Sequence, residues 1–337
     1  MAASIDIATI WAFIIAFAVF VYVVMDGFDL GLGILFPLFP NKADRDAIMN
    51  SVAPVWDGNE TWLVLGGGGM MAAFPLAYAV LMPALYTPMI AMLIGLIFRG
   101  VAFEFRWRTT QSGRNRWDIA FAGGSLLAAL AQGIALGAIL QGIHVEGRHY
   151  AGGWWDWLTP FSILTGLALA VGYALLGTTW LVLKTEGTLR DRAYVLSWSL
   201  LFAMLGAIGA VSIATPFLHI QYAQRWFTWP NLILTAPVPI AVAAVAVMLL
   251  RSLASKRDYQ PFFLSLTLFA LSYAGLGISM WPYIVPQSIT IWQAASPENS
   301  QVFMLFGVAV LVPLILGYTA WAYWVFRGKV RHGSGYH

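Results

Sequence analysis

The chain has 337 residues, of which 60% are hydrophobic, 15% aromatic and only 10% charged, and its mean hydropathy is +0.75. Soluble globular domains are only about half apolar, so this composition predicts an integral membrane protein, and the small net charge of +3 is spread between apolar runs in a way that excludes a nucleic-acid-binding surface. The absence of cysteine excludes disulfides, zinc thiolates, iron–sulfur clusters and covalently attached c-type haem.

About nine apolar stretches of roughly 20 residues or more, the length that crosses a bilayer as a helix, follow one another along the chain. They lie at about 8–36, 57–77, 79–103, 118–142, 160–183, 194–216, 231–251, 261–283 and 302–326. No hydrophilic segment between them is long enough for a soluble domain, so we predict a single all-α transmembrane domain over residues 1–337. The first stretch extends past Leu30 without a basic segment before it, which predicts a retained helix and not a cleaved signal peptide.

The number of helices depends on Pro75, which interrupts one long apolar run. A turn there gives nine spans, whereas a kink would give one overlong helix and invert everything downstream. With nine spans and an external N-terminus, only Arg148 and Arg225 fall outside, and the basic residues of the other connections are cytoplasmic. These are Lys42, Arg45, Arg106, Arg108, Arg114, Arg116, Lys184, Arg190, Arg192, Arg251, Lys256, Arg257, Arg327, Lys329 and Arg331. The positive-inside rule therefore predicts nine helices, a periplasmic N-terminus and a cytoplasmic C-terminus.

Two pairs of carboxylates lie within or beside the first two apolar stretches, where an ionised group is costly and calls for a partner or a function. Asp26 and Asp29 are three residues apart inside the first predicted helix and share one helical face. Asp57 and Glu60 have the same spacing at the start of the second helix, so we expect their titrations to be coupled. With a rise of 1.5 Å per residue, Asp29 lies on the order of 10 Å from the cytoplasmic end of its helix.

Arg99 and Glu104 in the third predicted helix belong to the same inner half of the membrane, so all six ionisable groups are predicted to meet at one depth. This pattern favours a half-channel that carries protons from the cytoplasm to about the midplane, in which Arg99 keeps some acids ionised while others titrate. Two simpler interpretations stay open. One is a salt bridge to Arg99 that serves packing alone, and the other is capping of the second helix by Asp57 and Glu60.

The histidines and a run of glycines carry weaker signals. The histidines are His144, His149, His219, His332 and His337. They fall in external loops, at helix ends or in the C-terminal tail, where we expect them to be solvated, and no two share a helix in a way that would hold a haem. The glycines at 66–69 lack the Lys-Ser/Thr of a phosphate loop and predict close helix packing, within the chain or against a partner helix.

Four segments form a distinctive set: residues 25–33, residues 54–63 with the sequence Trp-Asp-Gly-Asn-Glu, residues 98–106 and residues 318–321. Together they resemble subunit II of the cytochrome bd-type quinol oxidases. The resemblance runs the whole length of the chain and includes the loop at 286–289. Segments 33–37 and 184–187 are most similar to the cyanide-insensitive branch of that family.

The resemblance implies two four-helix bundles plus one peripheral helix, paired with a homologous subunit I in the bacterial inner membrane. In this family, subunit I holds the quinol site, two b-type haems and one d-type haem, and it reduces oxygen to water with protons taken from the cytoplasm. Subunit II is implied to bind no haem and to provide a proton inlet, with Asp57 on the route toward haem d. A structural quinone in this chain, a small single-helix accessory subunit and membrane lipids are further implied partners.

The sequence therefore predicts the haem-free subunit of a quinol oxidase that contributes a proton pathway. Its predicted residues are Asp57 as the relay, Glu60 as a coupled acid, and Asp26, Asp29, Arg99 and Glu104 as groups that tune the inlet. A proton-coupled transporter that works alone and a purely structural assembly subunit are the alternatives. Copurification with a second multispanning chain and with haem absorption distinguishes the oxidase from the transporter.

Overall fold

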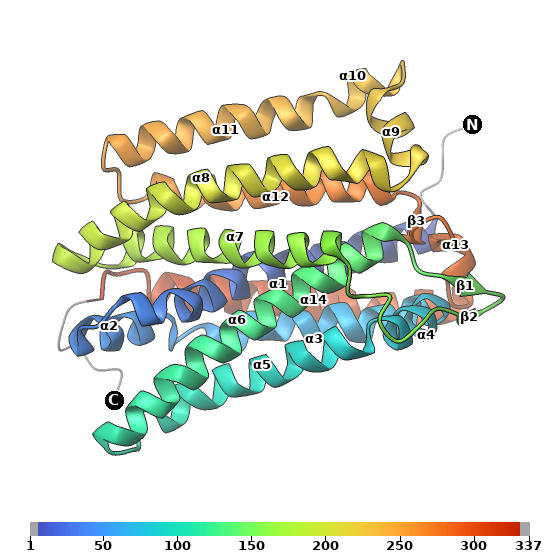
Figure 1. Ribbon diagram of the computed structural model, residues 1–337. Coiled ribbons are helices and arrows are strands. Elements are labelled where there is room, and N and C mark those ends of the chain that lie inside the picture. The colour runs from blue at the N-terminus through green and yellow to red at the C-terminus, as the bar shows by residue number, and fades with distance from the viewer. Residues whose placement is uncertain (1–5, 331–337) are drawn as a thin grey trace.

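Long helices that run back and forth between two ends of the molecule form most of the structure (Figure 1). The computed structural model describes residues 6–330. Eight of the described helices are long and apolar enough to cross a membrane, and the bent pair α3 and α4 supplies a ninth span, which confirms the predicted all-α class. In chain order the spans are α1 (Ile7–Leu35), α3 (Trp56–Ala73) with α4 (Pro75–Ala84), α5 (Tyr86–Phe105), α6 (Gln111–Gln141), α7 (Pro160–Lys184), α8 (Gly187–Leu218), α11 (Pro237–Ala254), α12 (Gln260–Met280) and α14 (Glu298–Val325).

The turn predicted at Pro75 is present, and it bends the chain by 120° between α3 and α4. Phe74 has non-helical dihedral angles, and Pro75 occupies the first position of α4, where its missing N–H removes no helical hydrogen bond. The third long helix begins later than predicted, at Tyr86 instead of residue 79. Pro88 explains the difference, because it cannot donate the hydrogen bond that would continue α4, so a new helix starts with Pro88 in its first turn.

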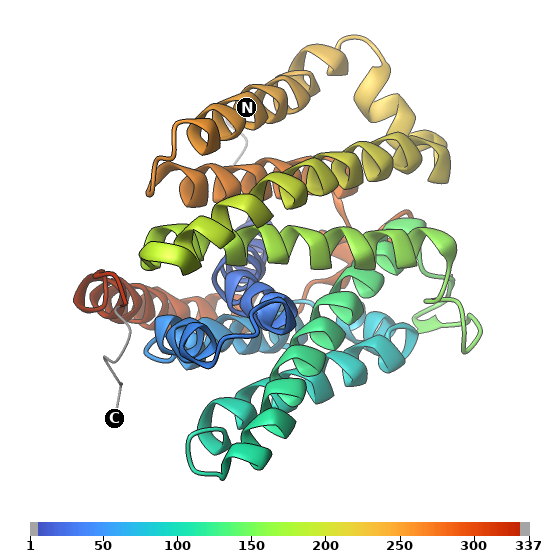
Figure 2. The ribbon, with the colours of Figure 1, turned by 60° about the vertical axis from the view of Figure 1, so that its left-hand side comes forward.

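Two groups of four helices and one further helix make up the fold. The first group consists of α1, α3, α5 and α6, and the second of α7, α8, α11 and α12, with α7 lying against α1 and α6. Figure 2 shows α14 at the side of the first group, where it packs on α1 and α3. This arrangement confirms the predicted two bundles with a peripheral helix.

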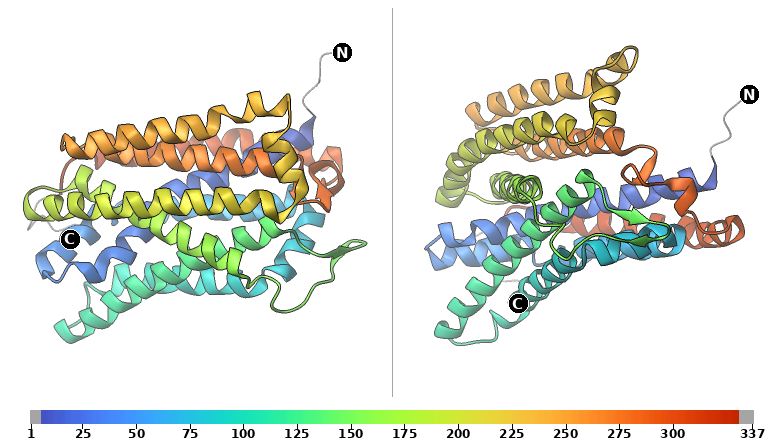
Figure 3. Two further views of the ribbon diagram at one scale, coloured as in Figure 1. Left: turned by 45° about the horizontal axis from the view of Figure 1, so that its top comes forward. Right: turned by 45° about the vertical axis from the view of Figure 1, so that its right-hand side comes forward.

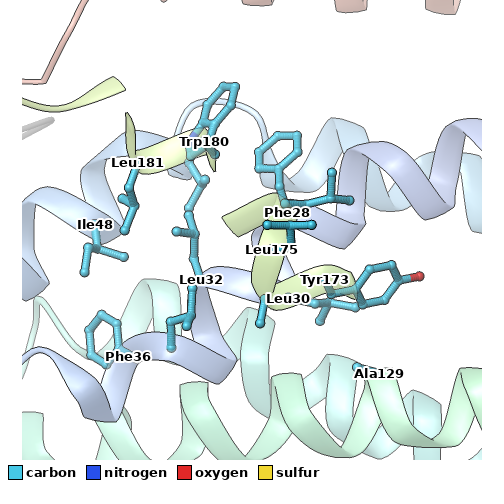
Figure 4. Close-up of a cluster of buried hydrophobic side chains, with 14 of the residues drawn as sticks. Phe28, Leu30, Leu32, Phe36, Ile48, Ala129, Tyr173, Leu175, Trp180 and Leu181 are labelled. Atoms are coloured by element: carbon cyan, nitrogen blue, oxygen red, sulfur yellow. The ribbon is translucent and has the colours of Figure 1, made fainter. Parts of the chain in front are cut away.

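Glycines of α1 allow α7 to approach closely. A Cβ atom on Gly31 would lie 1.8 Å from the carbonyl oxygen of Tyr173, and one on Gly27 would lie 2.6 Å from the Tyr173 ring. Between these glycines, Phe28 stacks on Trp180 of α7 with 4.3 Å between the ring centroids, in the core shown in Figure 4. This packing fixes the rotation of α1 and thereby the direction in which its two aspartates point.

The two ends of the molecule differ (Figures 1 and 3). The basic end consists of η1 (Phe36–Leu38), α2 (Lys42–Val52), the α5–α6, α7–α8 and α11–α12 connections and the segment after α14 up to Val330. It carries the described basic residues that were predicted to be cytoplasmic, whereas Arg331 lies outside the described residues. The hairpin end carries two short hairpins and three short helices. These are β1 (Val145–Glu146), β2 (His149–Tyr150), β3 (Tyr283–Val285), β4 (Ile289–Thr290), α9 (Ile220–Phe227), α10 (Asn231–Thr235) and α13 (Ile291–Ala294).

An ion network at the basic end ties α2 to the first bundle. Arg106 Nε lies 2.6 Å from Asp118 Oδ1, and Arg106 Nη1 lies 2.6 Å from Asp46 Oδ1. Arg45 Nη1 completes the network at 3.0 Å from Asp118 Oδ2. Two arginines thus neutralise two aspartates, and we call these four residues the basic-end network.

The segment after α14 is held against the second bundle. Lys184, the last residue of α7, donates hydrogen bonds to the carbonyl oxygens of Phe326 and Gly328. Lys329 binds Asp258 in the α11–α12 connection. These contacts fix the basic end of α14, which otherwise packs mainly on the first bundle.

Candidate functional site

A fully buried ion pair joins α1 to α5. Arg99 Nη2 lies 2.6 Å from Asp26 Oδ1, and both side chains are 0% exposed. The guanidinium also lies 5.6 Å from the ring centroid of Trp56. A charge in such surroundings needs an opposite charge at close range, so each partner of this pair depends on the other.

Glu60 of α3 connects this pair to the surface of the chain. Its Oε2 lies 3.4 Å from the same Arg99 nitrogen that binds Asp26, and 28% of its side chain is exposed. Asp57 lies three residues earlier, in the first turn of α3, and its side chain is exposed. A line of carboxylates therefore leads from the exposed start of α3 to the buried arginine.

Asp29 is held by neutral side chains. Asn59 Nδ2 donates to Asp29 Oδ2 at 2.9 Å and to the Met25 carbonyl oxygen at 3.3 Å. The Tyr323 hydroxyl of α14 donates to Asn59 Oδ1 at 2.9 Å. An amide thus separates the buried carboxyl group from the tyrosine.

Neutral groups also adjoin Asp26. Tyr22 lies one turn earlier on α1, on the same face of the helix as Asp26. Gln132 Nε2 of α6 donates to the Tyr22 hydroxyl oxygen at 2.7 Å, and the Tyr173 hydroxyl of α7 donates to Gln132 Oε1 at 2.8 Å. Hydrogen bonds therefore extend from Tyr22, next to Asp26 on α1, to α6 and α7.

We call Asp26, Asp29, Glu60 and Arg99 the acid cluster. Three carboxyl groups share one arginine, and within residues 6–330 four buried polar atoms of the cluster have no hydrogen-bond partner: Asp26 Oδ2, Asp29 Oδ1, Arg99 Nε and Arg99 Nη1. Buried polar atoms in folded proteins are nearly always bonded to protein or to ordered water. A salt bridge built only for packing would be balanced in charge and fully bonded, so the cluster is better suited to holding water and exchanging protons.

The structure separates Glu104 from the site. Its side chain is 60% exposed and pairs with Arg108, one turn along α5, at 3.5 Å. Glu104 is five residues beyond Arg99, and at about 100° per residue it points roughly 140° away from it around the helix. Of the six groups predicted to share one depth, four are in contact, whereas Glu104 and Asp57 lie outside this cluster and their part in a proton pathway stays a prediction.

Asp57 is neither buried nor a capping ligand. The N-cap residue of α3 is Val55, and no side chain caps this helix end. In the described part of the chain, the Asp57 side chain makes no hydrogen bond or ion pair, although its place in the first turn favours a negative charge. Asp57 therefore does not cap α3 through a hydrogen bond, and what it offers this helix end is a negative charge near the positive end of the helix dipole.

The described histidines lie at the hairpin end, outside the membrane-spanning helices. His144 and His149 are exposed, as predicted for solvated residues. His219 departs from that prediction because it is half-buried and its Nε2 lies 2.7 Å from the Gln141 carbonyl oxygen. His332 and His337 lie outside the described residues.

The glycines at 66–69 divide between two faces of α3. A Cβ atom on Gly66 would lie 3.1 Å from Val19 of α1, whereas Gly67 and Gly68 have open space beside them. Close packing within the chain therefore involves only part of this run. The open glycines belong to the same exposed side of α3 as Asp57.

The site residues predicted from the sequence did not include five neutral residues that lie beside the acid cluster: Tyr22, Asn59, Gln132, Tyr173 and Tyr323. Asn59 lies within the Trp-Asp-Gly-Asn sequence and was readable as part of it. Gln132 is an amide within an apolar stretch of α6, a signal of the same kind as a buried acid. The tyrosines gave no signal, because aromatic residues are frequent throughout this chain.

Comparisons with known proteins place this geometry in a family. The model of the cytochrome bd terminal oxidase subunit II family matches residues 7–326. The chain belongs to this family. Cytochrome bd-I ubiquinol oxidase subunit 2 of Escherichia coli strain K12 is 32% identical over 95% of this chain and 94% of its own length. Cytochrome bd ubiquinol oxidase subunit 2 of Bacillus subtilis strain 168 is 27% identical over 96% of each.

A solved structure has the same fold. The bd oxidase from Geobacillus thermodenitrificans matches with a TM-score of 0.73 and 18% identity over 95% of this chain and 98% of the matched chain. As a cytochrome bd subunit II, this chain is part of an oxidoreductase complex that also contains subunit I. Family membership sets aside the transporter that works alone.

Proposed function

We propose that this subunit binds no haem itself and supplies a proton inlet from the cytoplasm to the oxygen-reducing haem of subunit I. The observation that carries the proposal is the acid cluster, in which Glu60 joins a buried Asp26–Arg99 pair to the exposed start of α3. Oxygen reduction at the haem consumes protons, and carboxyl groups within reach of one another or of one water relay them.

The exposed side of α3 supports delivery to a partner subunit. Asp57, Thr61, Val64, Gly68 and Met71 are exposed and recur every three or four residues, so they form one stripe along the helix. Small residues in such a stripe let another helix pack closely within a membrane. In the complex we expect subunit I to cover this stripe, so that Asp57 becomes a carboxylate at the subunit interface.

The distribution of basic residues supports the direction of the inlet. The basic end carries nearly all lysines and arginines of the connections, and in bacterial membrane proteins such an excess marks the cytoplasmic side. Asp57 begins a helix at that end, whereas the N-terminal end of α1 lies at the hairpin end (Figure 1). Protons would thus enter from the cytoplasm, with the N-terminus periplasmic and the C-terminus cytoplasmic.

Replacing Asp57 tests the inlet. In purified complex, we expect Asp57→Asn to leave haem content and spectra intact and to slow oxygen consumption per haem by about tenfold or more, because a proton relay has been removed. Asp191→Asn is the matched control, since Asp191 is an exposed aspartate at the basic end of the second bundle and pairs with Arg190 at 3.6 Å. Loss of haem in Asp57→Asn would favour a structural role, and a full rate would remove the relay.

A further inference from the structure

Two hydrogen-bonded chains lie beside the buried aspartates, and each contains an amide. One joins Tyr22, one turn from Asp26 on α1, to Gln132 and Tyr173, and the other joins Asp29 to Asn59 and Tyr323. Both chains end on a tyrosine hydroxyl that donates toward the amide. Each chain therefore places an amide between the side of a buried aspartate and a terminal tyrosine, and in the first chain Tyr22 precedes the amide.

The direction of the first chain is fixed by its donors. The Tyr173 hydroxyl donates to the Gln132 carbonyl, and the Gln132 amide donates to the Tyr22 oxygen. The two donors of this chain thus point toward Tyr22 and the side of α1 that carries Asp26, an arrangement that favours negative charge there.

An amide passes hydrogen bonds along but does not relay protons. Asn and Gln side chains have an NH₂ donor and a carbonyl acceptor, and neither gains or loses a proton near neutral pH. Each chain is therefore interrupted at its amide, and protons on Asp26 and Asp29 do not leave through Gln132 or Asn59.

Helix packing closes the route next to Gln132. A Cβ atom on Gly133 would lie 2.5 Å from the Thr165 carbonyl oxygen, and one on Gly137 would lie 2.6 Å from the Ser162 Cα atom. At these positions α6 and α7 are in backbone contact, which leaves no room for a file of water between them. The block at the amide is thus backed by a dry helix interface toward the hairpin end.

Glu60 is different because it is both a carboxylate and partly exposed. Its Oε2 and Asp26 Oδ1 contact the same Arg99 nitrogen, so these two oxygens are at most about 6 Å apart, a gap that a single water bridges. No amide stands between them. Among the four side chains of the acid cluster, Glu60 is the one that is partly exposed, and it belongs to α3.

We propose that the buried carboxyl groups of Asp26 and Asp29, which we call the side chamber, store protons and exchange them through Glu60. Gln132 and Asn59 keep protons from leaving along the two hydrogen-bonded chains. This proposal rests on the proposed inlet. It adds that Glu60 is the gate of the chamber and that the two amides isolate the chamber from the rest of the membrane interior.

A double-mutant cycle tests the gate. In purified two-subunit complex, proton uptake during a single turnover is followed with a pH indicator dye in Glu60→Gln, in Asp29→Asn and in the double variant. We expect each single variant to slow uptake, by about tenfold or more for Glu60→Gln, and the double variant to match Glu60→Gln within about twofold, because a closed gate makes the chamber irrelevant. Glu60→Asp, which keeps a carboxylate, should recover part of the rate.

Gln132→Met tests the block, with haem spectra confirming assembly. We expect its uptake rate to stay within about twofold of the wild type, since no proton passes the amide. A loss as large as that of Glu60→Gln would show that this chain conducts and would overturn the proposal, as would multiplicative effects in the double variant or a full rate in Asp29→Asn. If Asp57→Asn slows uptake and Glu60→Gln does not, the gate alone is wrong, whereas full rates in both variants would refute the inlet itself.

Discussion

The acid cluster and the basic-end network are both built from arginines and acidic residues, but they have different roles. In the basic-end network two arginines meet two aspartates, and every charged group has a partner within 3.0 Å. In the acid cluster one arginine meets three acids, and four buried polar atoms are left without a partner in the described chain. Charge balance and complete hydrogen bonding therefore separate a structural ion network from a site that is suited to exchanging protons.

The largest effect is expected at the centre of the acid cluster. Arg99→Met leaves Asp26 buried without a cation, which costs about 3–5 kcal/mol and should prevent assembly of a complex with normal haem content. Haem absorption per copurified complex measures this. Adding Asp26→Asn removes the stranded charge and should recover assembly but not turnover; assembly at the wild-type level in Arg99→Met would show that the pair is dispensable.

A matched pair of half-exposed acids sharpens the comparison. Glu60 and Asp46 have side chains 28% and 27% exposed, and each binds a buried arginine. We expect Glu60→Gln to slow oxygen consumption per haem by about tenfold or more, and Asp46→Asn to leave it unchanged. Equal losses of oxygen consumption in the two variants would mean that removing the acidic partner of any buried arginine slows turnover.

The basic-end network should matter for stability alone. Arg106→Met strands Asp46 and leaves Asp118 to Arg45, so we expect the complex to be destabilised by about 2–3 kcal/mol. Thermal unfolding of the purified complex measures this change. Turnover of the assembled fraction should stay at the wild-type value, and a slower turnover would place this network on the proton route as well.

The smallest effect concerns Asp258, which lies outside the membrane-spanning helices. Partial burial raises the pKa of its carboxyl group, but hydrogen bonds from Lys329 and Tyr194 and the nearby Arg190 outweigh this, so the pKa lies below its usual range. A lowered pKa adds stability above the pKa of the unfolded chain, about 3.9, and this stability is lost as the pH falls through the folded value. Asp258→Asn should therefore destabilise the protein by less than about 1 kcal/mol at pH 7, with the difference vanishing in acid.

The sequence was sufficient for the fold because its signals are local. Apolar length identified the spans, and the sign of the loop charges decided for a turn at Pro75, where the structure has a 120° bend. The start of the next helix was misplaced because two prolines, Pro83 and Pro88, lie close together. Pro83 lies inside α4, whereas Pro88 lies in the first turn of α5 and sets where that helix begins.

The charged half of the site was predictable and the neutral half was not. Asp26, Asp29, Glu60 and Arg99 were found because charge inside an apolar stretch is costly. Glu104 lies apart from these four because depth along a helix does not fix the angle around it, and its role in tuning the inlet stays a prediction. Tyrosines and amides cost less to bury, so their roles depend on which helices meet, and that information is tertiary.

The solvent isotope effect on turnover of Asp57→Asn tests the inlet most directly. If Asp57 relays protons to subunit I, its removal makes proton delivery rate-limiting, so oxygen consumption in the assembled complex should slow and the ratio of rates in H₂O and D₂O should rise above the wild-type ratio. A wild-type rate with an unchanged ratio would contradict the account, because the exposed carboxylate in the first turn of α3 would then carry no protons.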